Sequence, residues 1–148
     1  MTAGEGAPDP RPVATDAELA ACYGLMRQLR PSLSSEAEFV ERWKRQAAEG
    51  YRLLALWHGG NPVALAGFRA QENLVHGRHL YVDDLVTEEG ARSRGHGRVL
   101  IERLEREGRA LGCAKLVLDT PLSNALGHRF YYRQGLLATA LRFTKSLV

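Results

Sequence analysis

The sequence predicts a single α/β domain built on a mixed parallel and antiparallel sheet. Its 148 residues are 45% hydrophobic and 25% charged, values that suit one globular domain with a substantial core. Short apolar runs alternate with segments of helical periodicity, and no internal repeat is present. This order of strand and helix patterns is typical of α/β domains. The first residues are rich in Gly, Pro and Ala, so we assign residues 1–10 to a flexible N-terminus and residues 11–148 to the domain.

Two helices are expected near the beginning of the domain. Each is preceded by a capping pattern, in which a hydroxyl side chain stands three residues before a glutamate. Apolar residues then recur every three or four positions, which gives each helix one buried face. Pro31 ends the first helix and Gly50 ends the second. The two capping pairs are Thr15 with Glu18 and Ser35 with Glu38.

Apolar runs predict the strands of the sheet. Residues 51–57 and 62–70 are separated by the turn sequence His-Gly-Gly-Asn, which favours an antiparallel hairpin. Shorter runs of the same kind predict further strands at 11–14, 79–87, 115–119 and 138–146.

The run at 79–87 contains an irregularity. Leu80 and Val82 alternate with polar residues, but the next apolar residue is Leu85, so the period slips by one at Asp83-Asp84. One extra residue in a strand is the definition of a β-bulge. The sequence therefore predicts a bulge at the two aspartates.

Two more helices are expected, at about 96–111 and 125–134. In the first of these, leucines recur on an inward face, and Glu and Arg residues four positions apart form outward pairs. The leucines are Leu100, Leu104 and Leu111, and the expected pairs are Glu102 with Arg106 and Glu105 with Arg109.

The turn Arg92-Ser93-Arg94-Gly95-His96-Gly97 stands directly before the helix at 96–111. Backbone amides of a first helical turn have no partner within the helix, and here no side-chain cap is available. Glycines let a ligand approach the backbone, and Arg92, Arg94 and Arg98 add positive charge. A pyrophosphate would satisfy these groups together, although a solvated basic loop would account for the same six residues. The glycine spacing fits neither a Walker loop nor a dinucleotide fingerprint.

The turn matches the Arg/Gln-x-x-Gly-x-Gly/Ala signature of GNAT acetyltransferases at Arg92, Gly95 and Gly97. Farther along the chain, Asn124 precedes Phe130-Tyr131 by the spacing found in the same family. With the order of helices and strands, these motifs make nearly the whole chain resemble that family. The remaining matching position is Gly135, and the departures are Gly127 where alanine is common and Leu136 where phenylalanine is common.

This resemblance implies the GNAT fold, a twisted sheet with helices on both faces, and acetyl-CoA as co-substrate. In such proteins the bulged strand separates from its neighbour, and its free backbone groups bind pantetheine and the acetyl carbonyl. The implied cofactor-binding residues are Leu85, Val86, Thr87, Arg92, Ser93, Arg94, Gly95, His96, Gly97, Arg98 and Asn124.

Acetyl transfer to an amine requires a base for the amine and a proton for the leaving thiolate. By the resemblance, Tyr131 is the general acid, and a phenol with a reference pKa of about 10 is suited to that role. It could instead be a core aromatic residue. Asp83 is the candidate base, with Asp84 or a water chain as alternatives. Because adjacent strand residues point to opposite faces, we expect only one aspartate to serve.

The acceptor is expected to be a primary amine of a small molecule or peptide. Nothing in the sequence selects it further. An alternative function is that of an acyl-CoA-binding sensor that has lost catalysis. Either a monomer or a homodimer is compatible with the sequence.

Other classes of function are disfavoured. A net charge of +3 is small, and the arginines of the helix at 96–111 are interleaved with glutamates, so we expect no nucleic-acid partner. No apolar stretch reaches the roughly 18 residues of a membrane span, and no signal peptide is recognisable, so we expect a cytoplasmic protein without a membrane partner. Cys22 and Cys113 lack the spacing of a zinc site, so we expect no metal and two reduced thiols.

Overall fold

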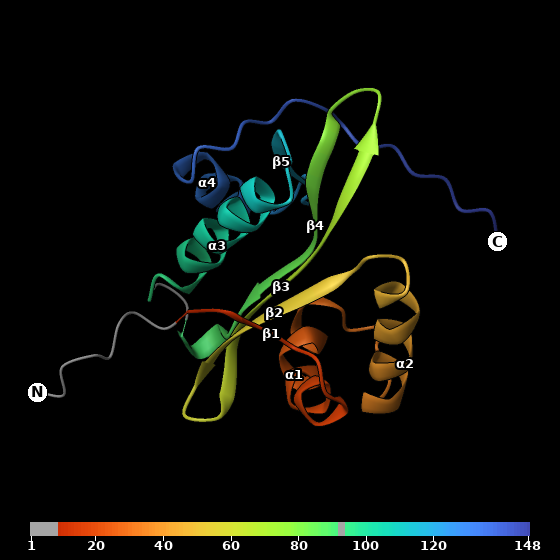
Figure 1. Cartoon of the computed structure of the whole chain (residues 1–148), viewed down its shortest axis with the longest axis vertical. Coiled ribbons are helices and arrows are strands. Elements are labelled where there is room, and N and C mark those ends of the chain that lie inside the picture. The colour runs from red at the N-terminus through yellow and green to blue at the C-terminus, as the bar shows by residue number, and fades with distance from the viewer. Residues whose placement is uncertain (1–8, 92–93) are drawn as a thin grey trace, which may run out of the picture. The chain divides into compact units, whose positions relative to one another are not determined.

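The computed structural model describes residues 9–91 and 94–148, in two compact units that divide after Val117. Five strands form one sheet in the order β1-β2-β3-β4-β5, and β1 to β4 are antiparallel (Figure 1). In chain order the elements are β1 Arg11–Pro12, α1 Asp16–Leu29, α2 Glu36–Ala47, β2 Arg52–His58, β3 Asn61–Asn73, β4 Gly77–Thr87, the short 3₁₀ helix Glu89–Ala91, α3 His96–Ala110, β5 Lys115–Leu118 and α4 Ala125–Arg133.

Helices of the first unit cover both faces of the sheet, as expected for the fold (Figure 1). On β2, Leu53 and Ala55 belong to the core cluster with α1 and α2. Leu54 and Leu56 are equally buried, and they point to the opposite face because strand residues alternate. The buried side chains of α3 lie against that face, since α3 contacts β3 and β4.

The predicted helix starts are confirmed. At α1, Thr15 Oγ1 accepts from the Glu18 amide at 3.1 Å, and Glu18 Oε1 accepts from the Thr15 amide at 3.2 Å, which completes a capping box. At α2, Ser35 Oγ accepts from the Glu38 amide at 3.1 Å. The helices end at Leu29 and Ala47, shortly before the proline and the glycine that were expected to stop them.

The hairpin and the bulge are also confirmed. His58 pairs with Asn61 across Gly59 and Gly60, whose φ values of 56° and 84° suit a tight hairpin turn. Farther along, Gly67 pairs with Asp84 and Phe68 pairs with Val82. Asp83 is therefore the extra residue of β4, at the point where the alternation of apolar residues slips.

The strand expected at 138–146 is absent, and that prediction is wrong. Residues 136–148 follow α4 as a segment without strand pairing, and every one of them except Leu136 is exposed. Alternation of apolar and polar residues is a property of one segment, whereas a strand also needs a neighbour for its backbone groups. Among the described residues of this chain, none pairs with the segment in that way.

Candidate active site

The start of α3 has the geometry of an anion-binding site. Gly95 is the N-cap with φ 80°, and no side chain caps the helix. The first backbone bond within the helix is donated by the Val99 amide to the Gly95 carbonyl, so the amides before it are available to a ligand. No acidic residue stands in the first turn, and a Cβ at Gly95 would meet open space. Two expected ligands, Arg92 and Ser93, lie outside the described residues.

His96 adds a second observation at the same place. Its Nδ1 atom is buried and has no hydrogen-bond partner among the described residues. A buried ring nitrogen of this kind normally has a partner in the folded protein. The start of α3 thus presents both free amides and an unsatisfied polar atom, and it fits the phosphates of a nucleotide cofactor.

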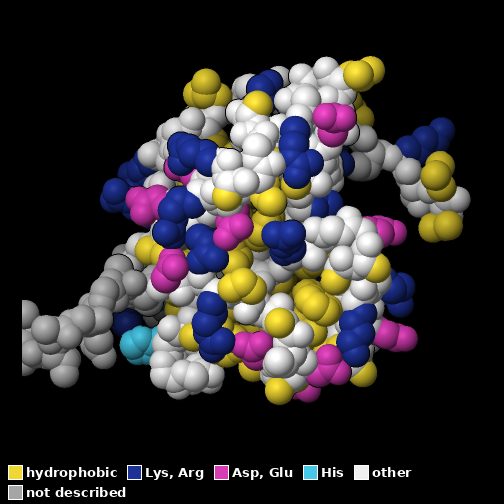
Figure 2. All heavy atoms as spheres, viewed as in Figure 1, with side chains coloured by type: hydrophobic (Ala, Val, Ile, Leu, Met, Phe, Trp, Pro, Cys, Tyr) yellow, Lys and Arg dark blue, Asp and Glu magenta, His cyan; other side chains and the backbone are white. Residues whose placement is uncertain are grey.

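The charges of α3 are largely paired along its exposed face. Glu105 contacts Arg109 at 3.9 Å, as predicted, but Glu102 contacts Arg98 at 2.9 Å rather than Arg106. The guanidinium of Arg106 lies 2.9 Å from Asp9 instead. Figure 2 shows Lys and Arg side chains interspersed with Asp and Glu on the viewed face. Of the three arginines expected to bind the ligand, Arg98 pairs with Glu102 and Arg92 lies outside the described residues. Arg94 forms no ion pair with another described residue.

The second half of β4 has a free backbone edge. The Ala114 amide donates to the Arg78 carbonyl at 2.8 Å, so β5 begins beside the start of β4. β5 has four residues, and at roughly 3.3 Å per residue it reaches no farther along β4 than about Val82. Residues 85–87 lie beyond that point. On the side of β5, their backbone groups face no strand among the described residues.

Both aspartates of the bulge lie on the same face of the sheet. Asp84 pairs with Gly67, and the following Val86 belongs to the core cluster under α1 and α2. Asp83 and Asp84 line one cavity of about 200 Å³ together with side chains of α1 and α2. The expectation that adjacent strand residues diverge is wrong here, because a bulge interrupts the alternation of side chains.

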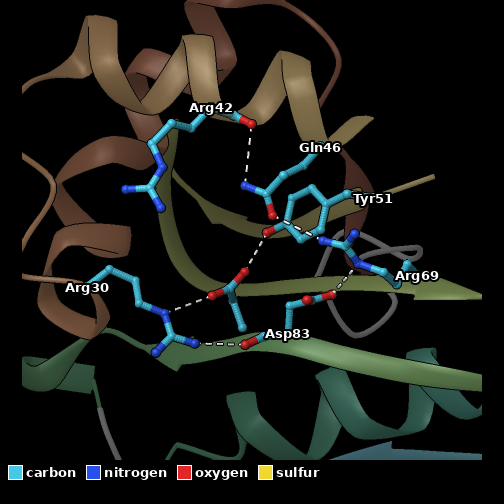
Figure 3. Close-up of polar contacts among 7 residues, drawn as sticks. Arg30, Arg42, Gln46, Tyr51, Arg69 and Asp83 are labelled. Atoms are coloured by element: carbon cyan, nitrogen blue, oxygen red, sulfur yellow. Dashed lines mark hydrogen bonds and ion pairs between the residues drawn. The ribbon is translucent and has the colours of Figure 1, made fainter. Parts of the chain in front are cut away.

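Two arginines and one tyrosine hold the aspartates from opposite sides (Figure 3). Asp84 accepts from Arg30 Nε at 2.9 Å and from the Tyr51 hydroxyl at 2.7 Å, so each of its oxygens has a donor. Asp83 accepts from Arg69 Nε at 3.0 Å through Oδ2 alone. Gln46 accepts from the other side of the Arg69 guanidinium at 3.0 Å. The described contacts therefore leave Oδ1 of Asp83 available.

Gly67 makes room for this arrangement. A Cβ at this position would lie 1.9 Å from the Tyr51 hydroxyl oxygen, which is far inside the van der Waals contact distance of these two atoms. Only glycine opposite Asp84 lets the tyrosine reach across β3 to the carboxylate. A single glycine in the middle of a long strand thus serves the packing of the site.

Burial changes the acidity of two of these groups. It raises the pKa of Asp83 above the ordinary value of 3.8, although the hydrogen bond and the charge of Arg69 act in the opposite direction. It also raises the pKa of Tyr51 well above 10, and the negative charge of Asp84 adds to that effect. Asp83 therefore holds a proton more readily than a solvated aspartate, and Tyr51 stays protonated.

The alkaline stability of the protein should depend on Tyr51. Its phenol is neutral in the folded state but ionises near pH 10 once unfolded, so its contribution to stability is complete below pH 10 and is lost as the pH rises further. We expect Tyr51→Phe to flatten the decline of the urea midpoint between pH 9 and 11. At pH 7 it should cost about 1–2 kcal/mol, because Asp84 loses a donor.

The control for this experiment is Tyr132→Phe, which removes a tyrosine that is 56% exposed. That variant should keep the decline of the unaltered protein. Equal slopes for Tyr51→Phe and the unaltered chain would contradict the prediction.

Three partners of the aspartates were not foreseen. Arg30, Tyr51 and Arg69 come from the end of α1, the residue before β2 and the middle of β3. Charged or polar residues in an apolar strand and just after a helix are weak signals by themselves. Arg69 within the apolar run at 62–70 was the one available hint, since a lone charge there needs a partner.

Two of the expected site residues belong to the second unit. Asn124 is the N-cap of α4, and its Oδ1 accepts from the Gly127 amide at 3.1 Å. A Cβ at Gly127 would lie 2.4 Å from the Asn124 side chain, which explains glycine where the motif commonly has alanine. Tyr131 lies within α4 with its ring edge-on to Phe130, and burial raises the pKa of its phenol above 10.

Comparison with protein families decides the class of this protein. The model of the acetyltransferase (GNAT) family matches residues 19–136, which include the bulge, the start of α3 and α4. The chain belongs to the GNAT acetyltransferase family. GNAT acetyltransferases use acetyl-CoA, and the uncapped start of α3 is the feature of this chain that fits its phosphates.

Individual relatives agree with this assignment. The chain is 32% identical over 114 residues to the uncharacterized N-acetyltransferase YhdJ of Bacillus subtilis (strain 168), covering 77% of this chain and 80% of that one. The aminoglycoside N-acetyltransferase AAC(6')-Iy in complex with CoA has a TM-score of 0.83 at 19% identity, with 100% of both chains covered. An acetyltransferase of Trypanosoma brucei has a TM-score of 0.79 at 22% identity, with 94% of this chain and 99% of that one covered. These two structures share the GNAT fold.

Within 9–91 and 94–148, no helix is long and apolar enough to cross a bilayer. The same residues contain no group of three or more His, Cys, Asp or Glu side chains that could hold a metal ion.

Proposed function

We propose that this GNAT acetyltransferase moves an acetyl group from acetyl-CoA to a primary amine of a small molecule or peptide, by direct attack in a ternary complex. One observation carries the proposal. The bulge at Asp83 places a carboxylate in the cavity beside α1 and α2, and the backbone of residues 85–87 is open immediately after it. A base for the amine and binding groups for the acetyl thioester would thus be adjacent.

The donor would be held by backbone groups. The free amides at 94–98 suit the pyrophosphate, with His96 Nδ1 as a further polar contact. Residues 85–87 would bind the pantetheine arm and the acetyl carbonyl through the edge that β5 leaves open. An amide directed at the carbonyl oxygen would stabilise the negative charge that develops there during attack.

Asp83 is proposed as the base that prepares the amine. Its Oδ1 is available in the described contacts, whereas both oxygens of Asp84 have donors. A lysine-like amine has a pKa near 10.4 and is charged at neutral pH, so it must lose a proton before it attacks. A carboxylate with a raised pKa accepts that proton more readily, directly or through a water molecule. Asp84, with Arg30 and Tyr51, would position Asp83.

Tyr131 is proposed as the acid that protonates the departing thiolate. A coenzyme thiol has a pKa near 8.5, so a neutral phenol nearby can donate to the thiolate as the thioester breaks. Burial raises the pKa of Tyr131 and so keeps it in the protonated form that this step needs. Asn124 would support the step by capping the helix that carries Tyr131.

A thiol-release assay with acetyl-CoA and a panel of amines tests the proposed reaction. The panel should contain polyamines, amino acids, aminoglycosides and peptides with free termini or lysines. Thiol release with at least one of them, matched by a gain of 42 Da in the amine, is the expected result. Tight acetyl-CoA binding without release across the panel would favour an acyl-CoA sensor instead.

The role of Gly95 can be tested by substitution. Gly95→Ala forces a side chain into the left-handed region, at a cost of about 1–2 kcal/mol. Because the altered turn would bind the donor, we expect KM for acetyl-CoA to rise about tenfold, which corresponds to about 1.4 kcal/mol, with little change in kcat.

Gly112→Ala is the matched control, since Gly112 also has positive φ, at 72°, and lies beyond the other end of α3. It should reduce stability by a similar amount and leave KM unchanged. If both variants shifted KM alike, general destabilisation would explain the effect and Gly95 would lose its proposed role.

A cytoplasmic location remains part of the proposal. Cys22 and Cys113 are both free thiols in the structure. Reduced cysteines are usual in the cytoplasm and uncommon in oxidising compartments, so this observation supports the proposed location.

A further inference from the structure

The cavity beside the bulge has both charged and apolar walls. Its volume is about 200 Å³, which is less than the roughly 300–1,000 Å³ of pockets that hold drug-sized ligands. Asp83 and Asp84 line it from β4, and Arg30 and Arg42 line it from the helices. The apolar part of the wall consists of Met26, Leu33, Phe39 and Trp43. A small acceptor with separate charged and apolar groups would fit this lining.

The two aspartates do not make this cavity strongly acidic. Arg30 donates through Nε to Asp84 at 2.9 Å. Arg69 donates through Nε to Asp83 at 3.0 Å. Each carboxylate therefore already has an opposite charge in contact, which cancels most of its attraction for a more distant cation. A polycation would gain little from these aspartates, and it would bring more positive charge close to the arginines.

Arg42 is an arginine of the cavity wall whose donors are mostly unused. Among the described residues it forms an ion pair with Glu38, four residues earlier in α2, at 3.5 Å. This distance is longer than that of an ordinary hydrogen bond, and exposed pairs of this kind stabilise a helix only slightly. The other oxygen of Glu38 accepts from the Ser34 amide at 2.8 Å. Because a guanidinium has five N–H donors, most of those of Arg42 are available to a ligand.

These donors lie on the side of the sheet that carries the aspartates. Figure 3 shows the side chain of Arg42 reaching from α2 toward β4, and Arg42 and Asp83 line the same cavity. Arg30 is more fully engaged, since it uses Nε for Asp84 and Nη2 for the Asp83 carbonyl at 2.8 Å. The cavity therefore presents an available cation at Arg42 and an available carboxylate oxygen, Oδ1, at Asp83.

We propose that Arg42 binds a carboxylate of the acceptor, and that the acceptor is a small amino acid with a free carboxylate and an apolar side chain. This inference rests on the proposed function, because it assigns the amine of the acceptor to Asp83. A guanidinium can bind a carboxylate through two parallel hydrogen bonds, which fix its orientation. A zwitterion adds no net charge to the cavity, and its side chain would lie against the apolar wall.

Acetylation of paired acceptors tests the role of Arg42. Leucine, methionine and phenylalanine are each compared with their α-amides, which keep the amine and the apolar side chain but lack the carboxylate. We expect Arg42→Gln to lower kcat/KM for the free amino acids about 10–100-fold, mainly through KM, because a charged hydrogen bond is lost. The value for the amides should stay within about twofold. Comparing the two proteins cancels the difference in basicity between an amino acid and its amide.

Arg45→Gln is the matched control, because it removes the same charge from α2 at a residue that does not line the cavity. It should leave both kinds of acceptor unaffected. Arg42→Lys should restore part of the activity toward free amino acids, since lysine keeps the charge but lacks the paired donors. If the amides were acetylated as well as the free acids, or if Arg42→Gln affected both equally, the inference would be overturned while the proposed acetyl transfer stood.

Equilibrium binding tests the same site independently of catalysis. The three amino acids and their amides are titrated calorimetrically into the complex of the full chain with CoA. The free acids should bind more tightly than the amides, and Arg42→Gln should weaken their binding about 10–100-fold. Carboxylate-dependent binding without thiol release would support the assignment of Arg42 and contradict the proposed function. Failure of all three acids to bind, or equal binding of acids and amides, would overturn the assignment.

Discussion

Asp83→Asn should lower kcat/KM for the amine by about 10²–10³-fold, the range expected when a general base is lost. The amide keeps the size of the side chain and can still accept from Arg69, but it cannot take a proton from the amine. KM for acetyl-CoA should stay nearly constant, because the proposed donor contacts come from backbone groups elsewhere.

The pH dependence gives this prediction a second readout. A base acts in its deprotonated form, so activity falls as the pH drops through the pKa of Asp83, which burial places above 3.8. Asp83→Asn should remove that acidic limb, while the limb caused by ionisation of the amine persists in both proteins. If the limb assigned to the carboxyl group survived unchanged in the variant, Asp83 would be excluded as the base.

Asp84→Asn separates catalysis from packing. This change removes the ion pair with Arg30 and alters the hydrogen bond from the Tyr51 hydroxyl. It should lower the free energy of unfolding by more than Asp83→Asn does, with a smaller effect on kcat per folded molecule. The opposite ranking would exchange the roles of the two aspartates.

Tyr131→Phe should lower kcat about 10²-fold, at the lower end of the effect of a general acid, because a thiolate is already a fair leaving group. KM for acetyl-CoA should change little, since the ring and its contact with Phe130 remain. Steady-state rates at saturating acetyl-CoA, with thermal denaturation of the same samples, measure both quantities.

Tyr132→Phe is the matched control for that variant. Tyr132 is the next residue of α4, and its side chain is 56% exposed. Its loss should leave kcat within about twofold, as expected for a surface substitution away from the site. If Tyr131→Phe left turnover unchanged, Tyr131 would be excluded as the general acid, and its role would be that of an aromatic residue in the packing of α4.

Sequence reasoning succeeded where the signal is local. The capping pairs at Thr15 and Ser35 involve residues three apart, and the bulge at Asp83 is visible because one apolar residue is out of phase. The free amides at the start of α3 could be predicted because Gly95 stands at the N-cap and has no side chain to cap the helix. Each of these features is determined by a few consecutive residues, so a single sequence contains enough information.

The rest depends on partners that are distant in the chain. Arg30 and Asp84 are 54 residues apart, and no local pattern relates them. The rule that neighbouring strand residues diverge failed at Asp83 and Asp84, because the bulge that was predicted there also suspends the rule. The strand at 138–146 was wrong for a related reason, since alternation does not supply a neighbouring strand.

The extra residue of β4 also determines which side chains of this strand face each layer of helices. Val82 and Val86 are both buried, but Val86 lies in the cluster with α1 and α2 while Val82 pairs with Phe68 on the face of α3. If β4 paired regularly through Asp83 without a bulge, alternation would turn the side chains from Asp84 onward to the opposite face, and Val86 would leave the cluster with α1 and α2. The pairing register of β3 and β4 therefore depends on the bulge at the site. A strand with regular pairing throughout would be incompatible with the observed core.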